Sequence, residues 1–359
     1  PWEGYVITRY GDARPTQRIE IAEAAHPVPD AAGEAATRHL LELVSNLTKD
    51  DTVIALISGG GSALLCAPIE GVSLDEKMAL SAALLASGAP ISEMNTIRKR
   101  LSRVKGGKMA EAVHPARLIT LMISDIPGDD PSLIASGPSV ADTSSAAAAL
   151  EIIDRRKIDL PDHLRAAINA SVDGPREGSA VFDRTRSVII AAPARSLHEA
   201  AQHAGAVEVR ILGDALEGEA RDLATEHVNM ALNMQRNMAQ GDRPILLLSG
   251  GECTVTKRGD GVGGPNAEYV LAATVALNGA KDIHVIACDT DGVDGAAEVA
   301  GAFAGPETLA KAARIGTSAR AALDTNNAHG FFEALGDQIV TGPTMTNVND
   351  FRAMLILPT

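Results

Sequence analysis

A buried strand that runs into consecutive glycines is the feature that most restricts what this chain can fold into. Residues 53–57 form an apolar run, and an amphipathic helical pattern begins at Leu74. Between them lie the residues predicted to bind phosphate: Ser58, Gly59, Gly60, Gly61 and Ser62. Consecutive glycines let the backbone adopt positive φ and approach a ligand with no Cβ in the way, and the exposed N–H groups suit an anion. A tight turn that binds nothing uses glycine too, so this simpler interpretation stays open.

A second apolar segment also runs into glycines. The stretch from Ile245 to Glu252 reads Ile-Leu-Leu-Leu-Ser-Gly-Gly-Glu. We expect Gly250 and Gly251 to form a second phosphate-binding loop, and Glu252 to contact either a metal or the substrate.

Strand-like and helix-like segments alternate along the 359 residues, which predicts an α/β fold with mainly parallel sheets flanked by helices. A polar break containing glycine and proline at residues 239–244 predicts two domains. The first is a Rossmann-like α/β domain over residues 1–240, and the second is a C-terminal α/β domain over residues 241–359. Ligands bind outside the carboxyl ends of parallel strands, so we expect the active site in a cleft between these domains.

Charge and composition limit the partners of the chain. A formal net charge of −14 argues against nucleic acid and against an anionic membrane surface, and 3% aromatic residues are too few for base stacking. Three widely separated cysteines provide neither a disulfide framework nor a zinc motif, which favours a reducing, cytoplasmic location. No apolar run reaches the roughly 18 residues of a membrane span, and no signal peptide is recognisable.

Acidic residues follow two further strand-like segments. Asp289, Asp291 and Asp294 have the spacing of oxygen ligands, and Mg²⁺ needs only one or two carboxylates besides phosphate oxygens. The same residues could instead form a turn stabilised by aspartate side chains. Asp125 directly follows the strand-like segment 117–124, which favours a carboxylate that faces a ligand, although it could simply cap the next turn.

The most basic part of this acidic chain lies between Arg98 and Lys108. A run of charges is most often a solvated helix face, but the Gly-Gly pair after Lys105 favours anion binding. Because arginine binds a carboxylate in a bidentate manner, we expect Arg98 to bind a carboxylate substrate. Glycine loops, acidic loops and basic side chains together match the requirements of phosphoryl transfer.

A series of spaced motifs occurs in one order along nearly the whole chain: His26–Asp30, Ser58–Ser62, Asn95–Lys99, Lys105–Gly107, Ser124–Asp125, Ile134–Pro138, Ser249–Glu252, Asp289–Gly295 and Thr341–Asp350. Together they resemble the glycerate 2-kinase family, whose C-terminal part is called the MOFRL domain. The resemblance implies transfer of phosphate from ATP to the 2-hydroxyl of D-glycerate, with ATP and Mg²⁺ as cofactors. It also implies that Asn95 joins Arg98 and Glu252 in binding the substrate, and that Asn266 contacts the nucleotide.

The chain departs from the family pattern at two places. The family has an upstream βα unit with a catalytic lysine in a Gly-Lys motif, and we expect that this segment was removed from, or left out of, the sequence starting at Pro1. Some members have an arginine where this chain has Pro265. Arg98 and Lys105 are the available replacements, and with Asp125 they form the predicted catalytic set. The predicted partners are ATP and a small hydroxy acid, with a homodimer as a further option.

Two alternatives to a kinase remain. Similar proteins are sometimes labelled hydroxypyruvate reductases, which are oxidoreductases, and a nucleotide-binding protein without activity is also consistent with the missing lysine segment. The first βα unit has neither a Walker A motif nor a dinucleotide fingerprint. Residues 259–264 have the letters of that fingerprint but follow a hairpin-like segment, which is the wrong context.

Overall fold

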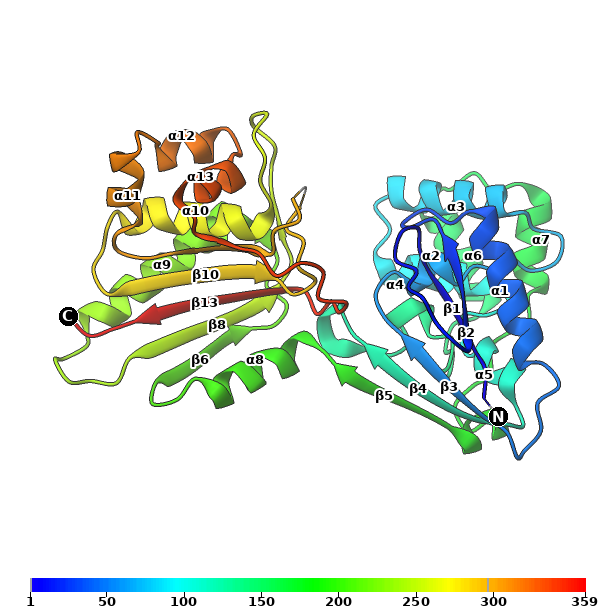
Figure 1. Cartoon of the computed structure of the whole chain (residues 1–359). Helices are drawn as coiled ribbons and strands as arrows, with labels where there is room; N and C mark the ends of the chain where they lie inside the picture. The colour runs from blue at the N-terminus through cyan, green and yellow to red at the C-terminus, as the bar shows by residue number, and fades with distance from the viewer. Residues whose placement is uncertain (1, 296) are drawn as a thin grey trace. The chain divides into compact units, whose positions relative to one another are not determined.

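The computed structural model describes residues 2–295 and 297–359. The chain forms two compact units, Pro1–Ile190 and Ala191–Thr359 (Figure 1). Strands and helices alternate in both, which confirms the predicted α/β class.

Parallel strands organise the N-terminal unit. One sheet has the order β3 (Thr52–Ile57), β4 (Arg117–Ile123) and β5 (Thr185–Ala191), with β3 parallel to β4. β1 (Gly4–Arg9) and β2 (Ile19–Ala24) form a separate parallel pair. Because β3 and β4 run in one direction, the segments that follow them leave the sheet at the same edge.

The helices of the N-terminal unit enclose two apolar cores. They are α1 (Ala31–Val44), α2 (Gly61–Leu64), α3 (Leu74–Ala86), α4 (Ile91–Arg100), α5 (Lys108–Val113), α6 (Ala146–Arg155) and α7 (Asp162–Ala170), with the 3₁₀ turns η1 (Pro127–Asp129), η2 (Ile134–Ser136) and η3 (Ala180–Arg184). One core joins α1 and α5 to β3 and β4, and the other lies among α3, α4, α6 and α7. Polar side chains cap the N-termini of two of these helices. At α1, Asp30 accepts a hydrogen bond from Gly33 N at 2.9 Å, and at α3, Ser73 and Glu76 form a capping box.

The sheet of the C-terminal unit is mostly antiparallel, which corrects the prediction of mainly parallel strands there. Its order is β12 (Gln338–Ile339), β11 (Gly301–Ala304), β10 (Ile283–Asp289), β13 (Asp350–Ile356), β8 (Ile245–Gly251) and β6 (Glu208–Gly213). Only β6 and β8 pair in parallel. The direction reverses between β10 and β11, and β13 runs opposite to both of its neighbours, β10 and β8. β7 (Gly218–Glu219) and β9 (Cys253–Thr254) form a separate short pair.

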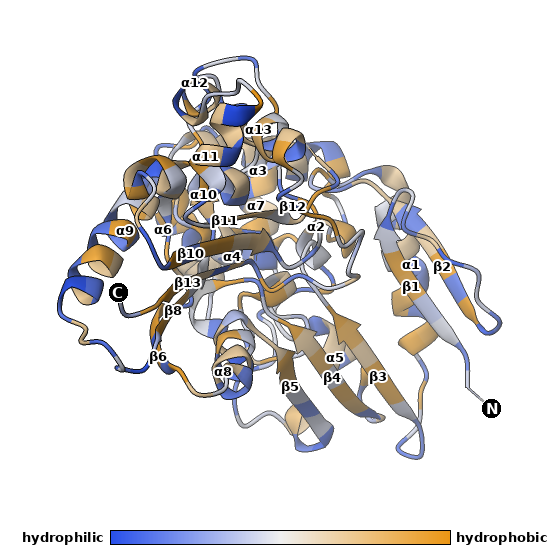
Figure 2. Ribbon diagram, turned by 60° about the vertical axis from the view of Figure 1, so that its left-hand side comes forward, coloured by the Kyte–Doolittle hydropathy of each residue, from blue (hydrophilic) through white to orange (hydrophobic). Residues whose placement is uncertain are grey.

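Helices cover both faces of this sheet. They are α8 (Pro193–His203), α9 (Ala220–Arg236), α10 (Pro265–Leu277), α11 (Thr308–Arg314), α12 (Ala319–Asp324) and α13 (Ala328–Leu335). The main core lies between the sheet and α9 and α10, whereas α8 packs Leu197 against Leu248 and Ala353. Figure 2 shows the apolar residues along β8, β10 and β13 that this packing requires.

The boundary between the units lies about fifty residues earlier than the sequence predicted, at residue 190 instead of 240. β6 pairs with β8, and α9 packs against α10, so both belong to the C-terminal unit. The polar break at 239–244 is a turn that connects α9 to β8 inside this unit.

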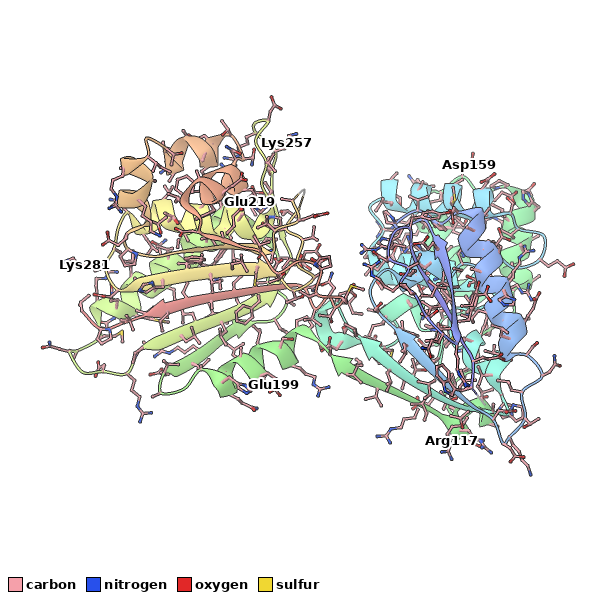
Figure 3. The ribbon with its side chains drawn as sticks, viewed as in Figure 1. Arg117, Asp159, Glu199, Glu219, Lys257 and Lys281 are labelled. Atoms are coloured by element: carbon pink, nitrogen blue, oxygen red, sulfur yellow. The ribbon has the colours of Figure 1, made fainter. Side chains whose placement is uncertain are left out.

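Charged side chains such as Lys257 and Lys281 lie on the surface (Figure 3). Within the described part of the chain, no helix is both long enough and apolar enough to cross a membrane.

A buried ion pair connects α9 to α10: Arg221 Nε donates to Glu268 Oε1 at 2.5 Å. The guanidinium also donates to the carbonyl of Leu323, at the end of α12.

We expect Arg221→Met to destabilise the C-terminal unit by about 3–5 kcal/mol, because it leaves the Glu268 carboxylate buried without its cation. Thermal unfolding would measure the loss. The control is Arg165→Met, which removes an exposed arginine from its ion pair with Asp154 and should barely change the melting temperature. Equal losses in the two variants would contradict the proposed importance of the buried pair.

Candidate active site

The glycine stretch after β3 is packed so closely that side chains are excluded. Gly60 has a φ of +79°, and a Cβ built there would lie 2.9 Å from His26 Nε2. A Cβ on Gly59 would collide with Asp125 Oδ2, and one on Gly61 would lie 3.0 Å from the Cβ of Ala135. The stretch therefore turns between three other segments of the N-terminal unit, and glycine is required by this packing as well as by its backbone conformation.

A chain of polar contacts holds the end of the glycine stretch. Lys105 Nζ donates to the carbonyl of Ser62 at 2.7 Å and to its Oγ at 3.1 Å. Ser136 donates its only hydroxyl proton to Asn95 Oδ1 at 3.2 Å, so in the Ser62–Ser136 contact of 2.9 Å the donor is Ser62. Three predicted residues, Ser62, Asn95 and Lys105, are thus brought together at the end of the glycine stretch.

The turn that contributes Ser136 has an unusual backbone. Ala135 and Ser136 both have positive φ, at 49° and 62°. This conformation costs a non-glycine residue of order 1–3 kcal/mol, and such residues cluster at functional sites. Sequence reasoning noted the small residues of this turn but did not assign them to the site.

Cations without acidic partners lie beside the glycine stretch. In the described part of the chain, neither Lys105 nor Arg98 has a carboxylate within ion-pair distance. Burial, and then the charges of Lys77 and Arg98, lower the pKa of Lys105 well below its ordinary value. Lys77 is buried as well, and its Nζ lies 3.3 Å from Cys66 Sγ. Burial without an acidic partner disfavours the charged forms of these side chains, and an anionic ligand would favour them.

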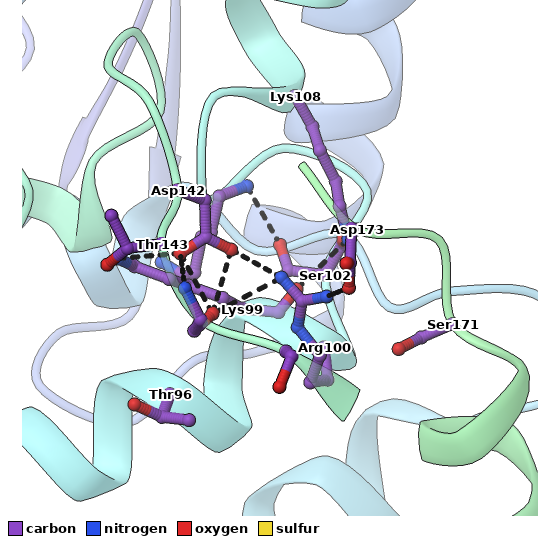
Figure 4. A network of polar contacts seen from close by, with 12 residues as sticks. Thr96, Lys99, Arg100, Ser102, Lys108, Asp142, Thr143, Ser171 and Asp173 are labelled. Carbon is purple, nitrogen blue, oxygen red and sulfur yellow. Dashed lines mark hydrogen bonds and ion pairs between the residues drawn. The ribbon is translucent and has the colours of Figure 1, made fainter. Parts of the chain in front are cut away.

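The neighbouring basic residues are neutralised and have a structural role. Arg100 is fully buried and pairs with Asp142 and Asp173, and Lys99 contacts the same Asp142 at 3.4 Å (Figure 4). Lys108 Nζ donates to the carbonyl of Lys99 at 3.0 Å, and burial lowers the pKa of Lys108 to about 8. These contacts hold the turn that contains Lys105, and they distinguish these paired cations from Arg98, which has no ion pair among the described residues.

Asp125 occupies the position predicted for it, directly after β4 and against Gly59. Burial raises the pKa of Asp125, while the nearby His26 opposes this rise. A carboxylate in this position can interact with a cation or a hydroxyl group at the glycine stretch.

The second glycine pair does not form a loop, which corrects the prediction for Gly250 and Gly251. Both lie inside β8, where they pair with Phe351 and Asp350 of β13. Their carbonyls accept hydrogen bonds from Arg352, at 3.0 and 3.3 Å. Gly251 has a φ of +108°, and a Cβ there would collide with the backbone of Leu216. These glycines are explained by close backbone packing. Glu252, the next residue, is exposed.

The three aspartates predicted to hold a metal do not form one cluster. Both carboxylate oxygens of Asp294 accept backbone hydrogen bonds at the start of α10, from Asn266 N at 2.9 Å and Ala267 N at 2.8 Å. Asp294 therefore caps this helix. In the described residues, no group of three or more histidine, cysteine or acidic side chains could hold a metal ion.

Asp289 remains a candidate metal ligand. It ends β10 beside Asp350, its partner on β13. Burial, and then the charges of Asp291 and Asp350, raise the pKa of Asp289 to about 7. The local accumulation of negative charge would be relieved by a cation, and Asp289 with Asp291 stays the predicted pair of Mg²⁺ ligands.

Sequence reasoning missed the polar cluster behind these aspartates. Asn266, predicted to contact the nucleotide, is fully buried and donates to Asp350 Oδ1 at 2.6 Å, while its own Oδ1 has no partner. Arg352 donates to the other oxygen of Asp350 at 2.6 Å, and His329 Nε2 lies 3.3 Å from Asp294 Oδ2. Only the motif ending at Asp350 pointed to this cluster, because Arg352 and His329 lie in unremarkable apolar segments.

We expect Gly60→Ala to abolish activity, because its Cβ would displace His26 or the loop itself. Gly88→Ala is the matched control: it has a similar φ of +67° but open space around its Cβ. It should cost about 1–2 kcal/mol of stability from backbone strain alone and keep its activity. Turnover and thermal unfolding of both variants would be measured, and equal activity losses would contradict the importance of the His26 contact.

Comparisons with known proteins agree with the resemblance. The model of the MOFRL family matches residues 245–350, and the model of a domain of unknown function, DUF4147, matches residues 1–169. A protein of Agrobacterium vitis with the provisional name hydroxypyruvate reductase is 48% identical, over 98% of this chain and 81% of its own. The D-glycerate 2-kinase of Thermotoga maritima is 36% identical, over 99% of this chain and 84% of its own.

A solved structure agrees as well. The crystal structure of the glycerate kinase of Thermotoga maritima superposes with a TM-score of 0.91 at 37% identity, covering 99% of this chain and 85% of that one. The relative and the crystal structure from Thermotoga maritima each cover 99% of this chain, so the chain belongs to the glycerate 2-kinase family, with its MOFRL region at residues 245–350.

Proposed function

We propose that this chain is an ATP-dependent kinase that phosphorylates the 2-hydroxyl of D-glycerate. The observation that carries the proposal is the pair of cations, Arg98 and Lys105, that lie beside the glycine stretch without a carboxylate partner in the described residues. Glycerate and ATP are both anions, and each would compensate this charge. Membership of the glycerate 2-kinase family supports the same reaction.

In this proposal, the N–H groups of the glycine stretch bind phosphate oxygens, and Arg98 binds the carboxylate of the substrate. Asn95 belongs to the same wall through its contact with Ser136. Lys105 is buried to 1% exposure, so it acts by positioning Ser62 and by contributing charge rather than by touching the substrate. Asp125 provides a carboxylate beside Gly59.

Magnesium enters this proposal with the nucleotide, as the Mg·ATP complex. Asp289 and Asp291 would hold it, because burial and the neighbouring carboxylates leave the charge of Asp289 poorly compensated. The ion, when bound, neutralises charge on the transferring phosphate. The other predicted metal ligand, Asp294, is excluded because its oxygens hold the start of α10.

The remaining sequence-based predictions stay predictions. They are a cleft between the two units, a role for Glu252 in substrate binding, a homodimer and a cytoplasmic location. Pro265, which replaces the arginine of some members, is the first residue of α10, a position that suits proline.

A hydroxypyruvate reductase is the alternative that the name of the Agrobacterium vitis relative raises. The fingerprint-like residues 259–264 argue against it. A Cβ on Gly259, Gly261 or Gly263 would meet the backbone of residues 325–327. These glycines therefore accommodate the chain's own backbone, whereas those of a dinucleotide site accommodate a pyrophosphate.

The proposal predicts that the purified protein releases ADP and forms 2-phosphoglycerate from D-glycerate and Mg·ATP. Direct chromatography of ADP and phosphorus NMR of the product would measure this without a coupled NADH assay. Arg98→Gln should raise the KM for glycerate about 10- to 100-fold, because a charged hydrogen bond is lost. The control Arg103→Gln removes an exposed arginine of the same basic segment and should leave KM unchanged. Absence of ADP release together with NADH consumption on hydroxypyruvate would replace the kinase with the reductase.

The two kinds of aspartate should be separable by mutation. Asp291→Asn should lower kcat at least about 10-fold by weakening charge stabilisation of the transferring phosphate, with little change in melting temperature. Asp294→Asn should lower the melting temperature, because the cap of α10 is weakened. Activity over a range of Mg²⁺ concentrations, combined with thermal unfolding, would measure both effects. If Asp291→Asn needed no more Mg²⁺ than the wild type, Asp291 would not be a ligand of the ion.

A further inference from the structure

His26 is the one titratable group at the glycine stretch to which neither the sequence motifs nor the family comparison gave a role here. It follows β2 and lies against the stretch: its Nε2 lies 2.9 Å from the position of a Cβ on Gly60, and Asp125 lies against the adjacent Gly59. The imidazole and the carboxylate therefore flank two consecutive residues of the proposed phosphate-binding backbone.

The ring of His26 is available for a ligand. In the described residues, neither of its nitrogens has a hydrogen-bond partner. The side chain is exposed, and the Nε2 edge of the ring packs against Gly60. An imidazole nitrogen without a partner is free to accept a proton from a bound hydroxyl group.

The electrostatic surroundings keep His26 neutral. Partial burial, and then the positive charge of Arg9 on β1, lower the pKa of His26, whereas Asp125 raises it. The net effect is a pKa below the ordinary value, so the ring is unprotonated at neutral pH and can act as a base. Once protonated, the imidazolium would be stabilised by the Asp125 carboxylate, as the acidic member of a catalytic triad stabilises its histidine.

We propose that His26 is a catalytic residue, the general base that accepts the proton of the substrate hydroxyl through Nε2. In this step the hydroxyl oxygen forms a bond to the γ-phosphorus of ATP, and the bond from that phosphorus to its bridging oxygen breaks. The electron pair of the broken bond stays on ADP, and the hydroxyl proton moves to His26 and later to solvent. The inference rests on the proposed kinase function and adds to it the residue that activates the hydroxyl.

The first test is His26→Gln, assayed by direct ADP release over the acid pH range. We expect kcat to fall about 100-fold or more while the KM for glycerate changes little, because general-base catalysis typically contributes about 10²–10⁴. The wild type should lose activity as the pH falls through the lowered pKa of His26, since the protonated ring cannot accept a proton. The variant should lack this acid limb. Exogenous imidazole should partly restore the activity of His26→Ala, which a purely structural role would not permit.

Two further variants provide controls. His203→Gln removes an exposed histidine whose Nδ1 contacts only a carbonyl of its own helix, and it should behave as the wild type. Arg9→Gln should keep the plateau activity and move the acid limb to higher pH at low salt, because a charge that lowers the pKa of His26 is removed. Arg9 is exposed and pairs with Asp12, so this change leaves the site intact.

The outcomes distinguish this inference from the kinase proposal. A wild-type protein that releases no ADP with glycerate would overturn both. An active wild type whose His26→Gln variant keeps its kcat, or whose Arg9→Gln variant has an unmoved acid limb at low salt, would overturn the role of His26 alone. Should His26→Gln fail to fold, the Arg9→Gln profile still decides the question.

Discussion

The contact between the buried amino group of Lys105 and Ser62 is the interaction on which the proposed site depends. It anchors the end of the glycine stretch through a backbone carbonyl and a hydroxyl group. A cation in this position has lost most of its hydration, which is costly unless hydrogen bonds or an anion compensate it. The Arg100–Asp142 pair fixes the turn that contains Lys105. This ion pair thus helps to keep the amino group of Lys105, which has no acidic partner among the described residues, where we propose that an anionic ligand binds.

The two glycine motifs look alike in sequence and have different physical causes. After β3, glycine leaves room for His26 and Asp125, which are polar side chains able to contact a ligand. In β8, glycine leaves room for the backbone at Leu216, and Arg352 binds the adjacent carbonyls. The glycines after β3 make room for polar side chains, whereas those in β8 allow close packing of the backbone. The sequence does not distinguish the two motifs, because both require the absence of a Cβ.

Local patterns predicted much of the fold, because apolar runs mark the strands. They also singled out Ser62, Asn95 and Lys105, which the structure brings into one chain of polar contacts. The unit boundary was missed because β6 joins β8 through a long-range pairing that no break in composition marks. Asp294 was misassigned because its spacing fits a metal ligand as well as a helix cap, and only the position of α10 decides between them. The role of Arg352 could not be predicted from the sequence, because this buried arginine in β13 binds a carbonyl that lies about a hundred residues away in the chain.

The position of β13 in its sheet has a consequence for how the C-terminal unit is made. This strand lies between β8 and β10, although residues 252–349 separate it from β8 in the sequence. Until it is inserted, the facing edges of both neighbours have unpaired backbone groups that can pair with other polypeptides. Assembly therefore depends on a contact with a large loop-closure cost, which slows folding and lengthens the exposure of those edges. A growing chain would be most vulnerable to aggregation just before β13 is available, and it would benefit from a chaperone at that stage.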